Sequence, residues 1–276
     1  METLYNTLYN TLRPLKRKAL IIFCTNTQSG KLEGLDVDNE NLRNYLKSCT
    51  GGCWKDREII SLENPTVQCV RECISNDFNG VDYAFVVFSG HGAYGINGQI
   101  LEVLDGNISE SELTYIATKQ TLVINACRKH LTTTAVNESR IFSFNVESIT
   151  RPLEILHRKM FDDAIKALSE GTNVIYSTSE NKYAYCGENG SVFINKMIDE
   201  CNKFGEGQKD SKGTLNTEEV VDMVGSIEVQ IQDGTDTQVP EIKLLNDSEA
   251  FPLAVRQISK IKRIKYNDET RTFSQR

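Results

Sequence analysis

Short apolar runs alternate along the chain with longer segments in which apolar residues recur at helical spacing. Runs of roughly 4–8 residues that are rich in Val, Ile and Phe and bounded by turn residues are typical of strands buried on both faces. The sequence predicts such strands at residues 18–23, 58–60, 83–87, 120–124 and 173–176. Helices are predicted at residues 38–47, 66–75, 109–118, 156–168 and 192–202, with a last αβ portion at 217–255. This alternation is typical of βαβ units, and it predicts an α/β fold with a mostly parallel central sheet and helices on both faces.

Two of the predicted strands end in residues that can carry chemistry. His91 follows the strand at 83–87, and Cys127 follows the strand at 120–124. The carboxyl ends of parallel strands form the crevice in which α/β proteins bind ligands. A Cys with a His is the minimal pair for thiol nucleophilic catalysis, and the two residues need not be close in sequence. The hypothesis from the residues alone is a cysteine hydrolase.

Glycines flank His91 on both sides, which chance alone does not supply. Gly92 leaves its backbone N–H unobstructed beside the histidine, as an oxyanion donor requires. The alternative interpretation is that Cys127 is an inert buried thiol, because free cysteines are among the most buried residue types. His130 and His157 are alternative partners for the thiol.

Composition excludes several classes of protein. The chain has 276 residues, 39% of them hydrophobic and 25% charged, which is ordinary for one large globular domain. Its net charge of -7 argues against a nucleic-acid-binding protein, because such proteins are normally basic. No apolar run approaches the roughly 20 residues that span a bilayer, so no membrane association is expected.

The first residues also lack the features of a signal peptide. An acid, Glu2, stands where a signal peptide carries positive charge, and no apolar stretch follows it. We therefore expect a cytoplasmic protein whose 8 cysteines are mostly reduced thiols.

Residues 125–128, Asn-Ala-Cys-Arg, resemble the active-site signature of caspases. The continuation Cys127-Arg128-Lys129 is similar to the sequence that follows the nucleophile of paracaspases. Further segments are similar to caspase or metacaspase elements and occur in family order, at residues 34–43, 175–179, 190–194, 238–240 and 251–254. Together these segments cover nearly the whole chain, which makes the resemblance specific.

The resemblance implies a three-layer caspase-like peptidase domain at residues 15–255, with a flexible arm at 1–14 and a tail at 256–276. It implies Cys127 as nucleophile, His91 as general base, and the N–H groups of Gly92 and Cys127 as oxyanion hole. In caspases, the segment matching residues 128–152 is the cleavable linker between large and small subunits. An ordinary surface loop is the alternative for that segment.

Substrate preference is where this chain departs from animal caspases. Those enzymes hold an aspartate side chain with arginines and a glutamine, and this chain has Leu32, Asn125 and Cys186 at the three matching places. Metacaspases and paracaspases instead line the pocket with carboxylates, and Asp38 matches their first acidic position. A helix N-cap is the structural alternative for Asp38.

The substrate loop of the family matches the region that follows Ser177. Glu180 and Glu188 in this loop could supply further negative charge. We therefore expect substrate contacts from Asp38, Asn125, Ser177, Glu180 and Cys186, and cleavage after Arg or Lys, with uncharged polar residues next and Asp last.

The spacing of four other cysteines is compatible with a structural zinc site. Cys49 with Cys53, and Cys69 with Cys73, form two C-x3-C pairs with a spacing that structural zinc tolerates. The second pair lies on a predicted helix, where it can simply face the core. We expect neither a metal nor another cofactor.

The predicted function is a cysteine endopeptidase in a regulated cell-death or immune-defence pathway, acting on a protein or peptide substrate. The alternative is a catalytically silent caspase-like module that binds or regulates an active partner. An activating ligand, a partner protein and a homodimer all remain open as means of activation.

Overall fold

The computed structural model describes residues 13–95, 98–129, 151–207, 212–232 and 234–258, the side chains of residues 151 and 152 excepted. These residues form a central sheet of six strands in the order β16-β10-β9-β5-β1-β4. All neighbouring strands are parallel except β16, which runs antiparallel to β10. The strands are β1 (Arg17–Phe23), β4 (Ile59–Glu63), β5 (Tyr83–Ser89), β9 (Lys119–Asn125), β10 (Gly171–Tyr176) and β16 (Glu241–Leu245). The expected mostly parallel sheet is confirmed.

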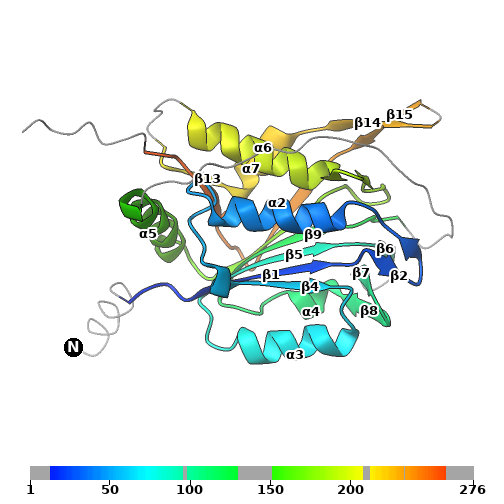
Figure 1. Ribbon diagram of the computed structural model, residues 1–276, viewed down its shortest axis with the longest axis horizontal. Coiled ribbons are helices and arrows are strands. Elements are labelled where there is room, and N and C mark those ends of the chain that lie inside the picture. The colour runs from blue at the N-terminus through cyan, green and yellow to red at the C-terminus, as the bar shows by residue number, and fades with distance from the viewer. Residues whose placement is uncertain (1–12, 96–97, 130–150, 208–211, 233, 259–276) are drawn as a thin grey trace, which may run out of the picture.

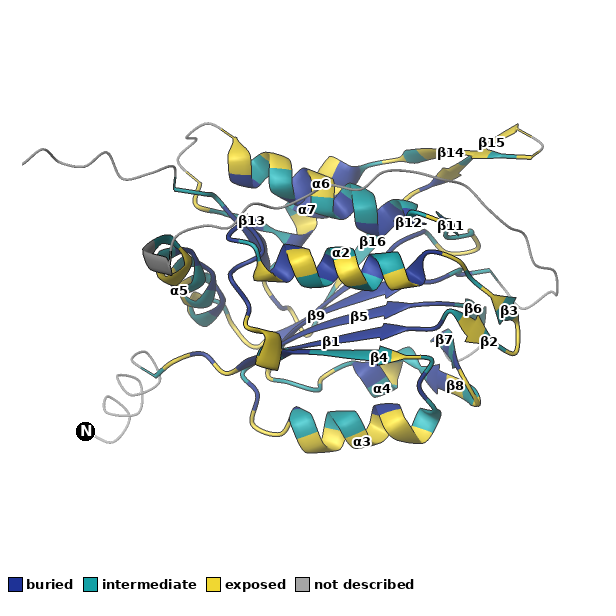
Figure 2. Cartoon of the chain, in the orientation of Figure 1, coloured by how far each residue is buried: buried dark blue, intermediate teal, exposed yellow. Residues whose placement is uncertain are grey.

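The central strands are buried on both faces, as their near-continuous apolar sequences predict (Figure 2). Successive side chains of β1 alternate between the two faces of the sheet because strands have a period of two. Ala19 and Ile21 join one hydrophobic core, whereas Leu20 and Ile22 join the other. Each core is closed by its own layer of helices.

Helices cover both faces of the sheet and give the expected three-layer arrangement (Figure 1). One layer contains α2 (Leu35–Lys47), α5 (Arg151–Ala167), α6 (Val192–Glu206) and α7 (Thr217–Val224). The other layer contains α3 (Val67–Asp77) and the short α4 (Glu110–Leu113). The fold predicted from the hydrophobic pattern is therefore confirmed.

Short strands and a 3-10 helix complete the fold. Some lie at the edge of the sheet where the parallel strands end, and others connect the helices. They are β2 (Asn26–Thr27), β3 (Gly30–Lys31), η1 (Asp56–Glu58), β6 (Gly92–Gly95), β7 (Gly98–Val103), β8 (Gly106–Ser109), β11 (Cys186–Gly187), β12 (Gly190–Ser191), β13 (Thr214–Asn216), β14 (Ile227–Ile231), β15 (Gly234–Gln238) and β17 (Pro252–Val255). The antiparallel sheet β6-β7-β8 follows His91 directly and was not predicted.

The helix predicted at residues 109–118 is wrong in length. Its capping box between Ser109 and Glu112 is present, but the helix ends at Leu113. The buried Gln120 side chain accepts a hydrogen bond from Ile116 N at 3.0 Å and donates one to Leu113 O at 2.5 Å. Tyr115 also has a φ of 60°, which a continuing helix does not allow. A single polar side chain thus replaces the hydrogen bonds that further helical turns would have made.

The predicted arm at 1–14, the loop at 128–152 and the tail at 256–276 fall mostly outside the described residues. Within the described part of the chain, none of the helices combines the length and apolar character needed to cross a membrane.

Candidate active site

The ends of β5 and β9 lie side by side in the sheet. Ser89 pairs with Asn125 at the last position of the two strands, and Gly90 N donates to Asn125 O at 3.2 Å. His91 and Cys127 each follow two residues after this pair. The structure therefore places both residues where neighbouring strands leave the same edge of the sheet.

His91 is half-buried and has one nitrogen available for chemistry. Burial lowers its pKa, against the opposing effects of the Glu102 carboxylate and of a hydrogen bond with the backbone of Gly30. The Nε2 atom is buried and has no hydrogen-bond partner among the described residues. The ring is therefore neutral near pH 7, with a nitrogen that can accept a proton.

Cys127 is half-buried and in contact with the backbone of Ala184, in the segment that precedes β11. Its sulfur accepts from Ala184 N at 3.4 Å and lies 3.7 Å from Ala184 O as a donor. Burial raises the pKa of the Cys127 thiol, although Ala184 N–H and the Lys129 cation act in the opposite direction. The resting side chain is therefore a neutral thiol, and a base must remove its proton before it can attack.

Gly92 lies where no larger residue fits. A Cβ atom at this position would come within 2.8 Å of Ala126 Cβ and 3.0 Å of Ile100 O. Gln99 fixes the neighbouring backbone, because its Nε2 donates to Cys127 O at 2.8 Å while its side chain is buried. Gln99 was not among the predicted site residues, although a polar residue at a core-facing position of an alternating strand is a recognisable signal.

Asp38 is fully buried and does not cap a helix. The N-cap of α2 is Gly34, so the N-cap alternative for Asp38 is wrong. Its Oδ1 accepts from Ser191 N at 2.7 Å, and its Oδ2 accepts from the hydroxyls of Ser191 and, at 3.2 Å, of Ser89. Burial raises the pKa of Asp38 to about 6, which these hydrogen bonds only partly oppose.

Asn125 completes this polar cluster, which comprises Asp38, Ser89, Asn125 and Ser191. Its Nδ2 donates to Ser89 Oγ at 2.7 Å and to Ser191 Oγ at 2.6 Å, so that both hydroxyls can donate to Asp38. In the described part of the chain, no Lys or Arg side chain forms an ion pair with Asp38. The carboxylate is thus held by neutral donors only.

Cys186 connects the polar cluster electrostatically to the catalytic candidate. Burial, with smaller effects of the nearby Asp38 and Cys127, raises its pKa to about 12. The structure therefore brings Asp38, Asn125, Cys186 and Cys127 into one neighbourhood. Ser89 and Ser191 are the members of the cluster that the sequence did not assign a role.

A family model for the caspase domain matches residues 16–250. The chain belongs to the caspase-domain family. Among solved structures, it is similar to the crystal structure of caspase-1 from Spodoptera frugiperda, with 17% identity and a TM-score of 0.57. That match covers 85% of this chain and 90% of the insect chain, and it supports the fold. None of the curated protein sequences is significantly similar to this caspase-domain chain.

The other three expected substrate contacts have different surroundings in this caspase domain. Ser177 is buried beside the end of β9, where its N–H donates to Ile124 O at 2.9 Å and its carbonyl accepts from Gln238 Nε2 at 2.8 Å. Glu180 and Glu188 are exposed at the surface. Asp38 is accordingly the buried acid of this region.

Arg128 is buried, although the sequence predicted that it would begin a long loop. Its side chain is 1% exposed and donates to Glu241 Oε2 at 2.6 Å. The guanidinium also stacks over the Tyr176 ring at 4.0 Å. Its backbone pairs with Asn181 and Lys182 in the loop that contains Ala184. Arg128 therefore joins the end of β9 to the edge strand β16 and to the loop of residues 181–184.

The two C-x3-C pairs lie on different elements, one after α2 and one on α3. Within the described ranges, no group of three or more His, Cys, Asp or Glu side chains is placed to hold a metal ion.

Proposed function

We propose that this caspase-domain protein is a cysteine endopeptidase in which Cys127 attacks the peptide carbonyl and His91 acts as general base. The observation that carries the proposal is the pairing of β5 with β9 in register, which directs both residues out of the same sheet edge. The unpartnered Nε2 of His91 supplies the proton acceptor that a neutral thiol needs.

The reaction then follows from the protonation states. Substrate displaces the Ala184 backbone from the Cys127 sulfur, and Nε2 of His91 takes the thiol proton as the thiolate attacks. The N–H groups of Gly92 and Cys127 stabilise the oxyanion, and losing one such donor typically costs about 2.7–4 kcal/mol of transition-state stabilisation. His91 returns the proton to the leaving amine, and water hydrolyses the thioester.

We further propose that the enzyme cleaves after Arg or Lys. Asp38 is a buried carboxylate whose partners are hydroxyl and amide groups, so a substrate guanidinium would supply its missing counter-charge. A substrate aspartate would meet a like charge there, and the buried arginines of the described residues, Arg17 and Arg128, form their ion pairs with other acids. The charge of Asp38 therefore favours basic substrates.

A tetrapeptide library varied at P1 tests both parts of the proposal. Wild-type protein should cleave Arg and Lys peptides preferentially, and Cys127→Ala and His91→Ala should each abolish cleavage while remaining folded by circular dichroism. Preference for P1 Asp would contradict the basic pocket alone. Absence of cleavage by folded wild-type protein would favour the alternative, a catalytically silent module.

The family likeness also underlies a proposed role in a cytoplasmic cell-death or immune-defence pathway. Expression of wild-type protein in cells, with Cys127→Ala as control, tests this role by comparing viability. Equal viability under conditions that induce peptide cleavage would argue against it.

A further inference from the structure

Cys49 and Cys53 form a second reactive cluster in the turn that follows α2. The Cys53 thiol donates to the sulfur of Cys49, with 3.6 Å between the two sulfur atoms. The turn is closed by hydrogen bonds from Cys53 N to Ser48 O at 2.8 Å and from Gly52 N to Cys49 O at 3.2 Å. Cys53 itself adopts a φ of 53°, which is uncommon for a residue other than glycine. The backbone therefore holds the two thiols in contact.

The two thiols differ in protonation. The hydrogen bond from Cys53 and the neighbouring His157 lower the pKa of Cys49 to about 5, although burial acts in the opposite direction. The same hydrogen bond and burial raise the pKa of Cys53. The imidazole of His157 is neutral in this arrangement, because its Nε2 accepts from Ile258 N at 2.9 Å and its Nδ1 donates to Leu153 O at 2.6 Å, so the hydrogen bond from Cys53 is the main support of a Cys49 thiolate. Cys49 is thus the thiolate of the pair and Cys53 the thiol.

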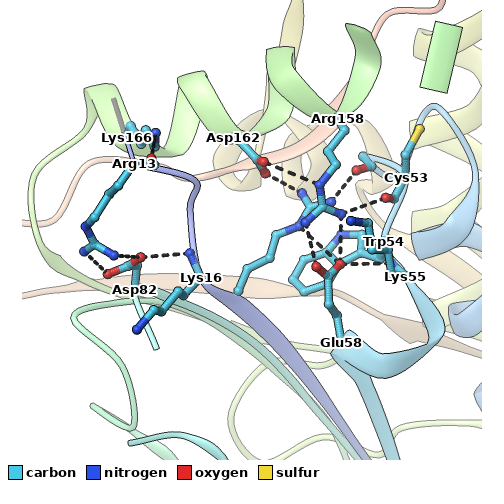
Figure 3. A network of polar contacts seen from close by, with 12 residues as sticks. Arg13, Lys16, Cys53, Trp54, Lys55, Glu58, Asp82, Arg158, Asp162 and Lys166 are labelled. Atoms are coloured by element: carbon cyan, nitrogen blue, oxygen red, sulfur yellow. Dashed lines mark hydrogen bonds and ion pairs between the residues drawn. The ribbon is translucent and has the colours of Figure 1, made fainter. Parts of the chain in front are cut away.

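A cavity reaches this pair from the side of Cys53, and Cys49 lies buried behind it. Cys53 is one of the residues lining a cavity of about 660 Å³, together with Trp54 and Arg158. Figure 3 shows Cys53 beside the Glu58–Arg158–Asp162 network, where Arg158 donates to Cys53 O at 3.0 Å. Residues just before β1 also line the cavity, so it lies at the opposite end of the parallel strands from His91 and Cys127. Chemistry here is therefore separate from the proposed active site.

We propose that Cys49 and Cys53 are a redox pair that hydrogen peroxide converts to a disulfide. The Cys49 thiolate attacks one peroxide oxygen, the O–O bond breaks, and the leaving hydroxide takes up a proton to give water and a Cys49 sulfenic acid. Cys53 then attacks the Cys49 sulfur, the S–O bond breaks, and the hydroxide leaves with the Cys53 proton as a second water. In sum, two thiols and one peroxide give one disulfide and two waters.

Cys49 and Cys53 differ from other cysteines mainly in the disulfide that they form, and less in the rate at which Cys49 first reacts with peroxide. A lower pKa increases the thiolate fraction but also lowers its nucleophilicity, with a Brønsted coefficient of about 0.4–0.5, so the two effects largely offset each other. The second step is different, because Cys53 already touches the sulfur that it attacks. A sulfenic acid at Cys49 should therefore be converted to the disulfide before it accumulates.

Cys69 and Cys73 provide a matched control with the same sequence spacing. They lie on α3, where Cys69 is exposed and Cys73 is half-buried. Burial, aided by Asp77 and Cys69, raises the pKa of Cys73 to about 11, so it remains a protonated thiol. We expect this pair to stay reduced where Cys49 and Cys53 become linked.

The experiment uses the full chain with Cys127→Ala, which removes the catalytic candidate from the oxidation chemistry. Protein is treated with hydrogen peroxide, alkylated with N-ethylmaleimide after denaturation, and digested with trypsin, which cleaves after Lys47 and Lys55. We expect the peptide of residues 48–55 to lose two hydrogens and carry no alkyl group, and dithiothreitol to reverse this. Cys69 and Cys73 should be alkylated.

A second variant, Cys53→Ser, tests the order of the steps. It should stop at a Cys49 sulfenic acid, which dimedone traps, and Cys49→Ser should leave Cys53 alkylated. Alkylation of both Cys49 and Cys53 in peroxide-treated protein, at doses that oxidise glutathione, would overturn the proposal. Equal disulfide formation by Cys69 and Cys73 would also overturn it.

Discussion

Asp38 carries an ionisable carboxyl group into the core of the domain. Its pKa is about 6 in the folded protein and 3.8 in a solvent-exposed reference, so the folded state binds a proton more tightly than the unfolded state. The sign of the linkage follows: this group's stabilisation is greatest when protonated and falls as the pH rises from about 4 to 6. Above about pH 6 to 7, the contribution of Asp38 to the free energy of unfolding changes little further.

This linkage predicts a pH-dependent difference between wild type and Asp38→Asn. Relative to the variant, wild-type protein should lose about 2–3 kcal/mol of unfolding free energy between pH 4 and 7.5. Denaturant titrations of both proteins at several pH values measure the difference. A constant difference across this range would show that Asp38 is not buried as a carboxylate.

The same substitution should reduce cleavage of P1 Arg peptides at pH 7.5. Without its charge, residue 38 leaves the substrate guanidinium desolvated and unpaired, a loss of about 3–5 kcal/mol for a buried pair. Glu180→Gln and Glu188→Gln are matched controls at exposed acids, where a pair contributes only about 0–1 kcal/mol. Values of kcat/KM for the three variants decide the matter, and equal losses would contradict the assignment of Asp38.

At this scale, the sequence indicated candidate residues by their chemistry. Asp38, Asn125 and Cys186 were predicted from their register with family motifs, and the structure brings them together near Cys127. The roles of Ser89 and Ser191 could not be predicted. They bind Asp38 across 51 and 153 residues of sequence, and local pattern says nothing about such contacts.

At the scale of elements, the sheet β6-β7-β8 supports the backbone on which both catalytic candidates depend. Tyr94 N donates to Lys129 O at 2.9 Å, and Gln99 binds the carbonyl of Cys127. This small sheet therefore positions the segment that follows β9. Its Gly92 begins the sheet and is also a candidate oxyanion donor.

Gln99 is accordingly expected to be a positioning residue. Gln99→Ala leaves the Cys127 carbonyl without its donor, and a lost hydrogen bond to a buried group costs about 1–3 kcal/mol. Because about 1.4 kcal/mol of activation free energy corresponds to a tenfold change in rate, we expect kcat to fall about tenfold or more. We expect KM to change little. Kinetics of the variant, with the exposed Gln230→Ala on β14 as control, test this. A change in thermal stability with unaltered kcat would reduce Gln99 to a structural residue.

The elements also show where local pattern fails. Strands such as β5 and β9 were predicted because each contains a short, strongly apolar run, which is typical of a strand buried on both faces. The end of α4 at Leu113 was not predicted, since the Gln120 side chain and the Tyr115 backbone override a helical signal. The sheet β6-β7-β8 was not predicted either. Elements that depend on one long side chain contact cannot be recognised from periodicity.

At the scale of the whole molecule, Arg128 connects the end of β9 with the edge strand of the sheet. It is buried, whereas its partner Glu241 on β16 is 41% exposed. Removing the acid would leave a buried cation without its counter-charge, while replacing the cation as well would leave an apolar core.

A double-mutant cycle tests this asymmetry. Glu241→Gln should lower the unfolding free energy by about 1–3 kcal/mol, less than for a fully buried pair because Glu241 is partly solvated. Adding Arg128→Met should recover part of this loss. Thermal and denaturant unfolding measure the unfolding free energies of Glu241→Gln, Arg128→Met and the double variant. A double variant less stable than both single variants would contradict the account.

The overall architecture was predictable because the alternation of strands and helices extends over the whole chain. Order in the sheet was predictable only in part. The adjacency of β5 and β9 follows from a single βαβ-like connection, whereas the antiparallel β16 pairs with β10 after α6, α7 and a hairpin. Nothing in the sequence of β16 distinguishes its direction, because strand direction is set by the path of the intervening elements.

The most direct test of the central claim is covalent labelling of the full chain with a tetrapeptide chloromethyl ketone that has Arg at P1. The account predicts one adduct by intact mass, located on Cys127, absent from Cys127→Ala and formed much more slowly by His91→Ala. A matching reagent with Asp at P1 should label Cys127 poorly, and Cys69→Ser should leave labelling unchanged. Labelling of the exposed Cys69 in place of Cys127, or equal labelling by the two reagents, would contradict the account.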